Sequence, residues 1–289
     1  MKVLIAGGTG FIGRTLIPFL VKKGNEVNVL TRRTMTDWEN IHYYQWNVDQ
    51  GSIDSRAFDG VDALINMTGA NIGEKQWTVD RKNEILNSRV KPLDFLLKAI
   101  IESGNRINVL ISSSAVGYYG AVTTNHIFTE EDKNGTDFPA YVCRLWEDAA
   151  LKFRDVADRV VILRKGLVIG PDGGIYQKLK PIAKLGLNVS LGNGQQYFPL
   201  VCINDLMNVY NHILTHNEID GVFNIVSNEH LTMNEFSDKM LQSFGRRRLF
   251  PNIPAWVVKM LFHERSQMLL QGSKVSNGKI MSTGFDFWY

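Results

Sequence analysis

Cysteine is scarce in this sequence, and so are long apolar runs and any large excess of charge of one sign. The two cysteines, Cys143 and Cys202, form neither a C-x-x-C pair nor a metal-ligand spacing. We therefore expect neither a disulfide framework nor a metal site. The 32 basic residues nearly balance the 29 acidic ones, for a net charge of +3. This balance gives no electrostatic reason to expect a nucleic-acid or membrane partner.

No stretch of the sequence approaches the apolar length of a membrane span. The first apolar run, Val3 to Ala6, is too short for a signal peptide, and glycines follow it at once. We expect a soluble cytoplasmic protein. With 289 residues, 44% of them hydrophobic, the chain can bury the core of one large domain or of two coupled ones.

Short apolar, β-branched runs alternate with segments of helical periodicity along the first 165 residues. This alternation is typical of right-handed βαβ units and predicts an α/β fold, a Rossmann-type doubly wound parallel sheet. The predicted strands are 2–6, 26–30, 43–48, 63–67, 108–112 and 159–165, and the predicted helices are 15–23, 77–103 and 141–154.

The composition of the sequence changes after Gly170. Glycine and proline become frequent, and aromatic residues stand in predicted loops. We therefore expect a Rossmann domain over 1–170 and a smaller, mixed, substrate-binding lobe over 171–289. Residues 221–226 are predicted to return to the main sheet as a strand.

The first predicted strand runs into a glycine loop, with Gly7, Gly10 and Gly13 in the spacing G-x-x-G-x-x-G. In such a loop the first glycine makes the tight turn, the second lets a pyrophosphate approach, and the third packs helix on strand. The following helix N-terminus favours the anion. Because the loop lies between a strand and a helix, it predicts a dinucleotide site. Its predicted cofactor-binding residues are Gly7, Thr9, Gly10, Phe11, Ile12 and Gly13.

The residues that follow the second strand indicate which dinucleotide is bound. NAD-binding domains place an acidic residue there for the ribose hydroxyl, whereas this chain has Arg32 and Arg33. Two guanidinium groups suit a 2′-phosphate, so we predict NADP rather than NAD. Asp49 is placed to meet the adenine or to form a turn or helix cap. Backbone near Thr68, Gly69 and Ala70 is predicted to pass close to the cofactor.

Longer motifs make the sequence similar to the extended short-chain dehydrogenase/reductase superfamily, which includes NAD(P)-dependent sugar-nucleotide epimerases and dehydratases. The resemblance spans nearly the whole chain and rests on the glycine loop and on segments 66–70, 111–120, 163–171 and 201–206. More narrowly, the sequence resembles an atypical branch, the "epimerase family protein" group, through segments 69–77, 87–90, 143–147, 170–174 and 284–287. Many proteins of this fold pair through helices, which implies a homodimer.

The sequence departs from the superfamily where the reaction takes place. Superfamily enzymes use a serine and a Y-x-x-x-K pair, in which tyrosine is the general acid/base and lysine lowers the tyrosine pKa. Ser114 matches the serine. Counted from Glu147 of the next helix, the tyrosine position falls on Pro139 and the lysine position on Cys143. Proline has no proton to give, and a neutral thiol cannot replace an ammonium.

Three interpretations of this gap remain. Tyr118, Tyr119 or Tyr141 approaches the nicotinamide from another backbone position, and Tyr118 is the one that we predict to act with Ser114. Alternatively, Cys143 itself reacts, although a small apolar core residue is its ordinary role. In the third interpretation, the site binds a cofactor and does no chemistry.

Substrate contacts are predicted beyond the carboxyl ends of the strands, where ligands lie in open α/β sheets. The segment after the fourth strand offers charged and aromatic side chains that either hold a polar or anionic substrate or form a solvated helix face. Residues 195–198 of the later lobe are placed to close over the same cleft. The predicted substrate residues are Glu74, Lys75, Trp77 and Arg89.

Three classes of function are compatible with these features. The first is an NADP-dependent oxidoreductase or epimerase acting on a small polar, sugar-like or nucleotide-linked substrate. The second is a sensor or regulator that binds NADP without turnover, which the missing Tyr-Lys pair favours. The third is a structural protein, against which the intact glycine loop argues.

Overall fold

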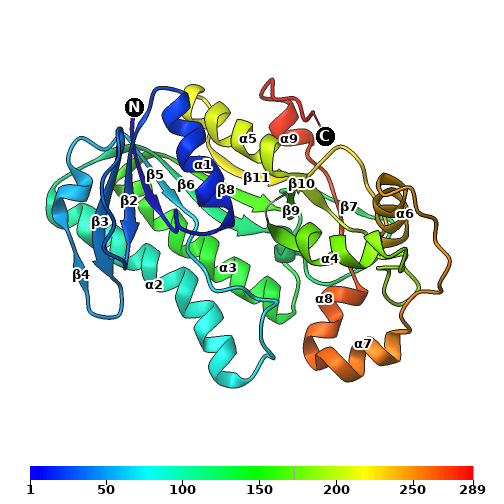
Figure 1. Ribbon diagram of the computed structural model, residues 1–289. Helices are drawn as coiled ribbons and strands as arrows, with labels where there is room; N and C mark the ends of the chain where they lie inside the picture. Colours follow the sequence, from blue (N-terminus) through cyan, green and yellow to red (C-terminus); the bar gives the residue numbers. More distant parts are fainter. Residues whose placement is uncertain (172, 289) are drawn as a thin grey trace.

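The computed structural model describes residues 1–171 and 173–288; Asp172, part of one family motif, lies outside the described residues. The main strands are β1 (Lys2–Ala6), β2 (Glu26–Thr31), β3 (Ile41–Asn47), β4 (Ser52–Ile53), β5 (Ala63–Asn66), β6 (Ile107–Ala115), β8 (Ala157–Lys165) and β11 (Gly221–Ile225). They form one sheet in the order β11-β8-β6-β5-β1-β2-β3-β4 (Figure 1). Every pair is parallel except β3 with β4. The predicted Rossmann-type parallel sheet is confirmed.

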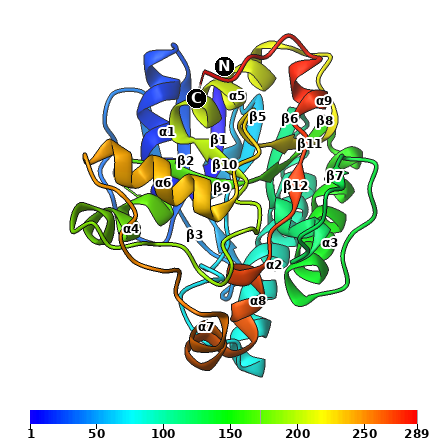
Figure 2. The same cartoon turned by 90° about the vertical axis from the view of Figure 1, so that its right-hand side faces the viewer.

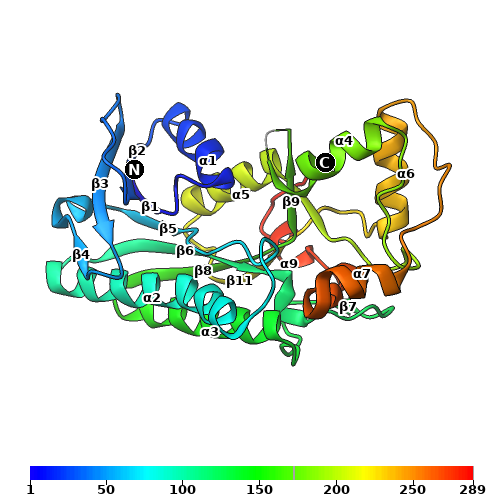
Figure 3. The same ribbon diagram turned by 60° about the horizontal axis from the view of Figure 1, so that its bottom comes forward.

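Helices cover both faces of this sheet. Helices α1 (Phe11–Lys22) and α5 (Ile203–Thr215) lie on one face, and α2 (Val79–Ser103) and α3 (Phe138–Leu151) lie on the other (Figure 3). Alternate residues of β1 enter two different cores, Val3 on the α1/α5 side and Leu4 on the α2/α3 side. Because both faces are buried, the central strands are apolar at nearly every position.

The order of the strands locates a crevice. From β1 the chain builds β2 and β3 on one side, and then crosses to β5, β6 and β8 on the other. At such a reversal the loops leave the sheet in opposite directions, and ligands bind there at the carboxyl ends of the strands. We call this end of the sheet the carboxyl edge.

The later part of the chain lies mainly at one end of the sheet. Besides α5, it contains the helices α4 (Gly174–Lys184), α6 (Met233–Ser243), α7 (Ala255–Phe262), α8 (Ser266–Leu270) and α9 (Gly278–Met281). Short parallel pairs join distant segments: β9 (Leu167–Gly170) with β10 (Leu200–Cys202), and β7 (Ile127–Phe128) with β12 (Lys274–Val275), as Figure 2 shows. Strand β11 departs from this lobe and pairs with β8 in the main sheet.

Several element boundaries differ from the sequence prediction by one to four residues, and two of these differences bear on the site. Helix α1 begins at Phe11, four residues before the predicted start at Thr15, because the extended Gly10 leads directly into it. Strand β6 continues to Ala115 rather than ending at Ser112. Its three serines remain in the sheet because β8 pairs with them as far as Lys165. Within the part of the chain that the structure describes, no helix combines the length and apolarity that a membrane crossing requires.

Candidate active site

The glycine loop packs backbone on backbone at the carboxyl edge. Gly7 has a φ of 84°, and a Cβ there would lie 2.7 Å from the carbonyl group of Met67 at the end of β5. A Cβ on Gly13 would overlap the backbone of Gly8. These two glycines are therefore required by the fold of the loop itself.

Gly10 is different, because it faces open space. A Cβ there would meet only Gly7 O, at an ordinary contact distance of 3.5 Å. The residue is exposed and immediately precedes α1, whose first-turn N–H groups have no partner within the helix. The space above Gly10 at a helix N-terminus fits a pyrophosphate. Of the other predicted loop residues, Thr9 is exposed, Ile12 packs against the α1/α5 core, and Phe11 packs against Gly173.

The two arginines after β2 are exposed. Within the described residues neither Arg32 nor Arg33 has a salt bridge, and the backbone N–H of Arg33 donates to Thr31 Oγ1 over 3.1 Å. Their guanidinium groups are thus available for an anion beside the loop. Asp49, after β3, is also exposed and lies in a turn, where its N–H donates to Asn47 Oδ1.

The segment after β5 links the glycine loop to α2. Thr68 Oγ1 donates to the buried Asn66 Oδ1 over 2.8 Å. A Cβ on Gly69 would lie 3.2 Å from Arg89 Cζ, so the guanidinium is pressed against this backbone. Arg89 Nη2 donates to the carbonyl oxygen of Ala70 over 3.1 Å. The predicted cofactor segment and a predicted substrate residue are therefore in direct contact.

A cavity of about 240 Å³ opens at the carboxyl edge beyond β6 and β8. Its wall is mostly apolar and comes from widely separated parts of the chain. Arg89, Cys143 and Lys165 contribute titratable groups to it, and Pro139 lies beside them. Gln196, Tyr197 and Phe198 of the later lobe also line it, as do Met268 and Leu269 of α8.

Two buried polar atoms in the cavity wall have no hydrogen-bond partner in the described structure. They are Trp146 Nε1, a donor, and Gln196 Oε1, an acceptor. Trp146 is 6% exposed and Gln196 is 2% exposed. An unpaired buried polar atom carries a free-energy cost of about 1–3 kcal/mol.

The serines of β6 point to opposite faces of the sheet, because strand residues alternate. Ser113 Oγ accepts a hydrogen bond from Lys165 Nζ over 2.6 Å. Ser114 Oγ instead donates to Glu147 Oε1 over 2.6 Å. A hydroxyl has one proton to donate, so Ser114 cannot donate to a reacting oxygen while this bond is in place. Its catalytic role stays a prediction.

Glu147 and Arg164 form a buried ion pair on the α3 side of the sheet. Arg164 Nε and Nη2 donate to the two carboxylate oxygens over 2.9 and 2.8 Å. The Arg164 guanidinium also lies 3.4 Å from the ring centroid of Tyr118. Tyr118 is thus held by stacking, and its role in proton transfer also stays a prediction. The neighbouring Tyr119 donates to Asn224 Oδ1, and burial raises its pKa to about 12.

Lys165 is the residue that sequence reasoning missed. It is 9% exposed, and burial, with a contribution from Arg89, lowers the pKa of its amine to about 7. Cys143 has shifted the other way: burial raises the pKa of its thiol to about 12. The sequence held a signal for Lys165. It is the last residue of the apolar run 159–165, which is predicted to be a buried strand, and a lysine is almost never buried unless it is paired.

Three of the four predicted substrate residues lie outside the cavity wall as the described residues define it. Glu74 is 3.6 Å from Arg81, Lys75 is exposed, and Trp77 Nε1 donates to Ile72 O over 2.9 Å. Arg89 alone of the four lines the cavity. The contacts of the other three with a substrate stay a prediction.

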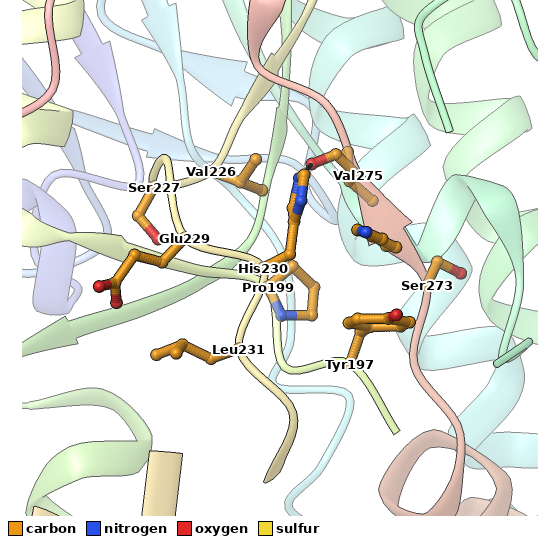
Figure 4. A pocket seen from close by; sticks show the side chains of 10 residues that line it. Tyr197, Pro199, Val226, Ser227, Glu229, His230, Leu231, Ser273 and Val275 are labelled. Atoms are coloured by element: carbon orange, nitrogen blue, oxygen red, sulfur yellow. Dashed lines mark hydrogen bonds between the residues drawn. The ribbon is translucent and has the colours of Figure 1, made fainter. Parts of the chain in front are cut away.

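Two further hollows adjoin the cavity. A cleft of about 1050 Å³ shares Gln196 and Gln271 with it and presents Asp137 and Lys259. Figure 4 shows the other, a crevice of about 10 Å³ between Tyr197 and His230. The crevice has room for about one water molecule. Among residues 1–171 and 173–288, no cluster of three or more His, Cys, Asp or Glu side chains is suited to a metal ion.

Comparisons with known proteins agree with this geometry. Residues 3–226 match the NAD dependent epimerase/dehydratase family, and residues 253–289 match a domain of unknown function, DUF1731. An epimerase family protein of Mycobacterium leprae is 31% identical over 99% of this chain and 91% of its own length.

Solved structures are similar over the full length. The crystal structure of human epimerase family protein SDR39U1 with NADPH is 30% identical, has a TM-score of 0.86, and covers 100% of this chain and 95% of its own. A UDP-glucuronic acid 4-epimerase from Bacillus cereus shares the fold, at 15% identity and a TM-score of 0.80 over 100% of this chain and 95% of its own. This chain therefore belongs to the NAD dependent epimerase/dehydratase family, among the epimerase family proteins.

Proposed function

We propose that the chain is an NADP-dependent oxidoreductase or epimerase that acts on a small polar substrate held in the 240 Å³ cavity. The observation that carries this proposal is the cavity itself, which lies at the carboxyl edge and has a mostly apolar wall with a few polar residues, among them Arg89, Lys165 and Gln196. Such a wall suits a small hydroxyl or carbonyl compound, because ligand sites are largely apolar with a small number of polar groups that fix orientation. When bound, a nicotinamide dinucleotide supplies a hydride donor or acceptor.

The chain's own residues have distinct tasks in this proposal. The open space above Gly10 and the N-terminus of α1 receive the pyrophosphate. Arg32 and Arg33 bind the 2′-phosphate, and the solved human relative with NADPH supports that choice of cofactor. The mostly apolar cavity wall excludes water from the reacting centre.

The adjoining cleft widens the range of substrates. Its Asp137 and Lys259 suit the polar remainder of a larger molecule, such as a nucleotide-linked sugar. The substrate's reacting end would then lie in the small cavity and its polar remainder in the cleft. We place this reaction in the cytoplasm, with a homodimer as the assembly.

A sensor that binds NADP without turnover is the second candidate. It is favoured by Pro139 and Cys143, which line the cavity where the family has tyrosine and lysine. A sensor needs a contact that differs between the oxidised and reduced cofactor. It therefore predicts unequal affinities for NADP⁺ and NADPH together with no oxidation of NADPH by aldehydes, ketones or nucleotide sugars.

Calorimetric titration of cofactor-stripped protein with NADPH and with NADH tests the proposal. We expect NADPH to bind more tightly. The double variant Arg32→Ala, Arg33→Ala should weaken NADPH binding by roughly 10- to 100-fold and leave NADH binding unchanged, because a hydrogen bond to a charged group contributes about 1.5–3 kcal/mol. The matched control is Arg246→Ala, Arg247→Ala, an exposed pair elsewhere. Absence of binding for both nucleotides would exclude both candidate functions.

A further inference from the structure

Lys165 brings a buried amine to the cavity. It is the last residue of β8 and pairs with Ala115 at the end of β6, so that it stands at the carboxyl edge. Its Nζ donates to Ser113 Oγ over 2.6 Å, and the residue lines the cavity. No salt bridge to Lys165 is found among the described residues, although buried charges are normally paired. A purely structural role would be served better by an apolar residue.

We propose that Lys165, with Ser113 as its hydrogen-bond partner, is the proton-transfer group of this site. The proposal rests on the proposed function, whose reaction it completes. In the oxidative direction, the O–H bond of a substrate hydroxyl breaks and its proton passes to the neutral Nζ. An oxidised nicotinamide dinucleotide, when bound, would supply the acceptor for the hydride from the same carbon. In the reductive direction, the ammonium returns a proton to the oxygen of the carbonyl as that carbon gains hydride.

The surroundings of Lys165 suit this task. Arg89 of α2 and Cys143 of α3 line the same cavity, and Tyr210 of α5 packs near Ser113. Burial raises the pKa values of Cys143 and Tyr210, so both are neutral. Burial and the positive Arg89 lower the pKa of Lys165 to about 7. An acid/base group is most effective when its pKa is near the working pH.

Other groups of the region are less suited to proton transfer. Cys143 keeps its proton at neutral pH, and the Ser114 hydroxyl already donates its hydrogen bond to Glu147 Oε1. The ring of Tyr118 stacks on Arg164, and Tyr118 does not belong to the cavity wall as the described residues define it. The amine of Lys165 therefore occupies the functional place that the family gives to its tyrosine, although it comes from a strand rather than from the helix that carries the family pair.

Competitive acetylation of the full-length protein over a pH series, read by peptide mass spectrometry, tests this placement without requiring a substrate. Lys91, an exposed lysine on α2, is the internal control. We expect Lys165 to react with a midpoint near pH 7 and Lys91 with the ordinary lysine midpoint near pH ~10.4. Saturating NADPH should slow acetylation of Lys165 several-fold and leave Lys91 unchanged. A Lys165 that stays unmodified, or that titrates like Lys91, overturns the proposal.

The NADPH arm separates the two proposals. If NADPH binds by calorimetry but gives Lys165 no protection, the amine is not at the cofactor site and this inference fails alone. If NADPH does not bind, the proposed function fails, and the acetylation midpoint still decides whether a reactive neutral amine faces the cavity. Ser113→Ala should shift that midpoint, because it removes the hydroxyl that accepts from Nζ.

Turnover gives a second readout. With NADPH and the polar carbonyl probes glyceraldehyde and dihydroxyacetone, Lys165→Met is expected to lower kcat by roughly 100-fold or more without changing NADPH affinity. Lys165→Arg should not restore kcat, because a guanidinium does not release its proton, and Lys91→Met should behave as wild type. Equal kcat in Lys165→Met and wild type overturns the proposal. Thermal unfolding of each variant shows that it is folded.

Discussion

Glu147 Oε1 accepts two hydrogen bonds, one from Ser114 Oγ over 2.6 Å and one from Arg164 Nε over 2.9 Å. The carboxylate thereby links β6, β8 and α3 behind the cavity. The family serine and the ion pair are therefore one connected network.

This network predicts a large loss of stability in Glu147→Gln. The change leaves the Arg164 guanidinium buried without its counter-charge, and breaking such a pair costs about 3–5 kcal/mol. Urea unfolding should show this decrease in the free energy of unfolding. Glu102→Gln, which removes an exposed ion pair with Lys98, is the control and should change stability by less than about 1 kcal/mol. Similar values for the two variants would contradict the structural role of the network.

Two glycines of the loop should respond to alanine in opposite ways. Gly10→Ala has an ordinary φ of −78° and space for its methyl group, so we expect wild-type stability with NADPH binding weakened at least tenfold. Gly13→Ala forces a methyl group into the Gly8 backbone and should lower stability by about 1–3 kcal/mol. Thermal unfolding and calorimetry distinguish the two effects. Tight NADPH binding by folded Gly10→Ala would show that the pyrophosphate lies elsewhere.

Cys143 should be chemically inert in the native protein. Burial raises its thiol pKa to about 12, so almost no thiolate exists at neutral pH, and the thiolate is the reactive form. Iodoacetamide at neutral pH is expected to modify the half-buried Cys202 first and Cys143 only after unfolding. Mass spectrometry of the two cysteine peptides gives the answer. Faster modification of Cys143 would revive the interpretation in which this thiol reacts.

Lys165 should make stability depend on pH. Its pKa is about 7 in the folded protein, against an ordinary value of 10.5, so between these values the unfolded chain binds more protons. The free energy of unfolding therefore rises with pH across that window. The destabilisation by the buried amine is fully present below pH 7. Lys165→Met removes the penalty, because a lowered pKa costs about 1.4 kcal/mol for each pH unit between the folded and unfolded values. Its stability advantage over wild type in urea should be largest near pH 7 and decline toward pH 10; a constant difference would contradict the lowered pKa of Lys165.

The sequence alone was sufficient for the sheet and the cofactor loop, because both are local patterns. Apolar runs at regular intervals predict parallel strands, and the spacing of Gly7, Gly10 and Gly13 predicts the anion site before any tertiary contact is known. The first turn of α1 was missed because the spacing of the glycines assigns residues 7–13 to the loop, whereas in the structure the loop and the helix overlap from Phe11 to Gly13.

The proton-transfer pair could not be predicted in this way. Ser113 and Lys165 are 52 residues apart and meet only through the register of β6 with β8. A change of register by one residue would exchange Ser113 for Ser114 and reverse the faces to which they point. The resemblance to the family led to Ser114, which the structure shows bonded to Glu147. The part of the cavity wall that α8 contributes could not be predicted either, because a helix of five residues is too short to give a periodic signal.

The place of β11 has a consequence for synthesis on the ribosome. Chains fold as they emerge, at about 5–20 residues per second, but β8 acquires its outer neighbour only when residues 221–225 have been made. Between the two strands the nascent protein carries a row of unpaired N–H and C=O groups along β8. Such an open strand pairs readily with other chains. We therefore expect the nascent chain to be prone to pairing with other chains through the open edge of β8 while residues 166–225 are being made.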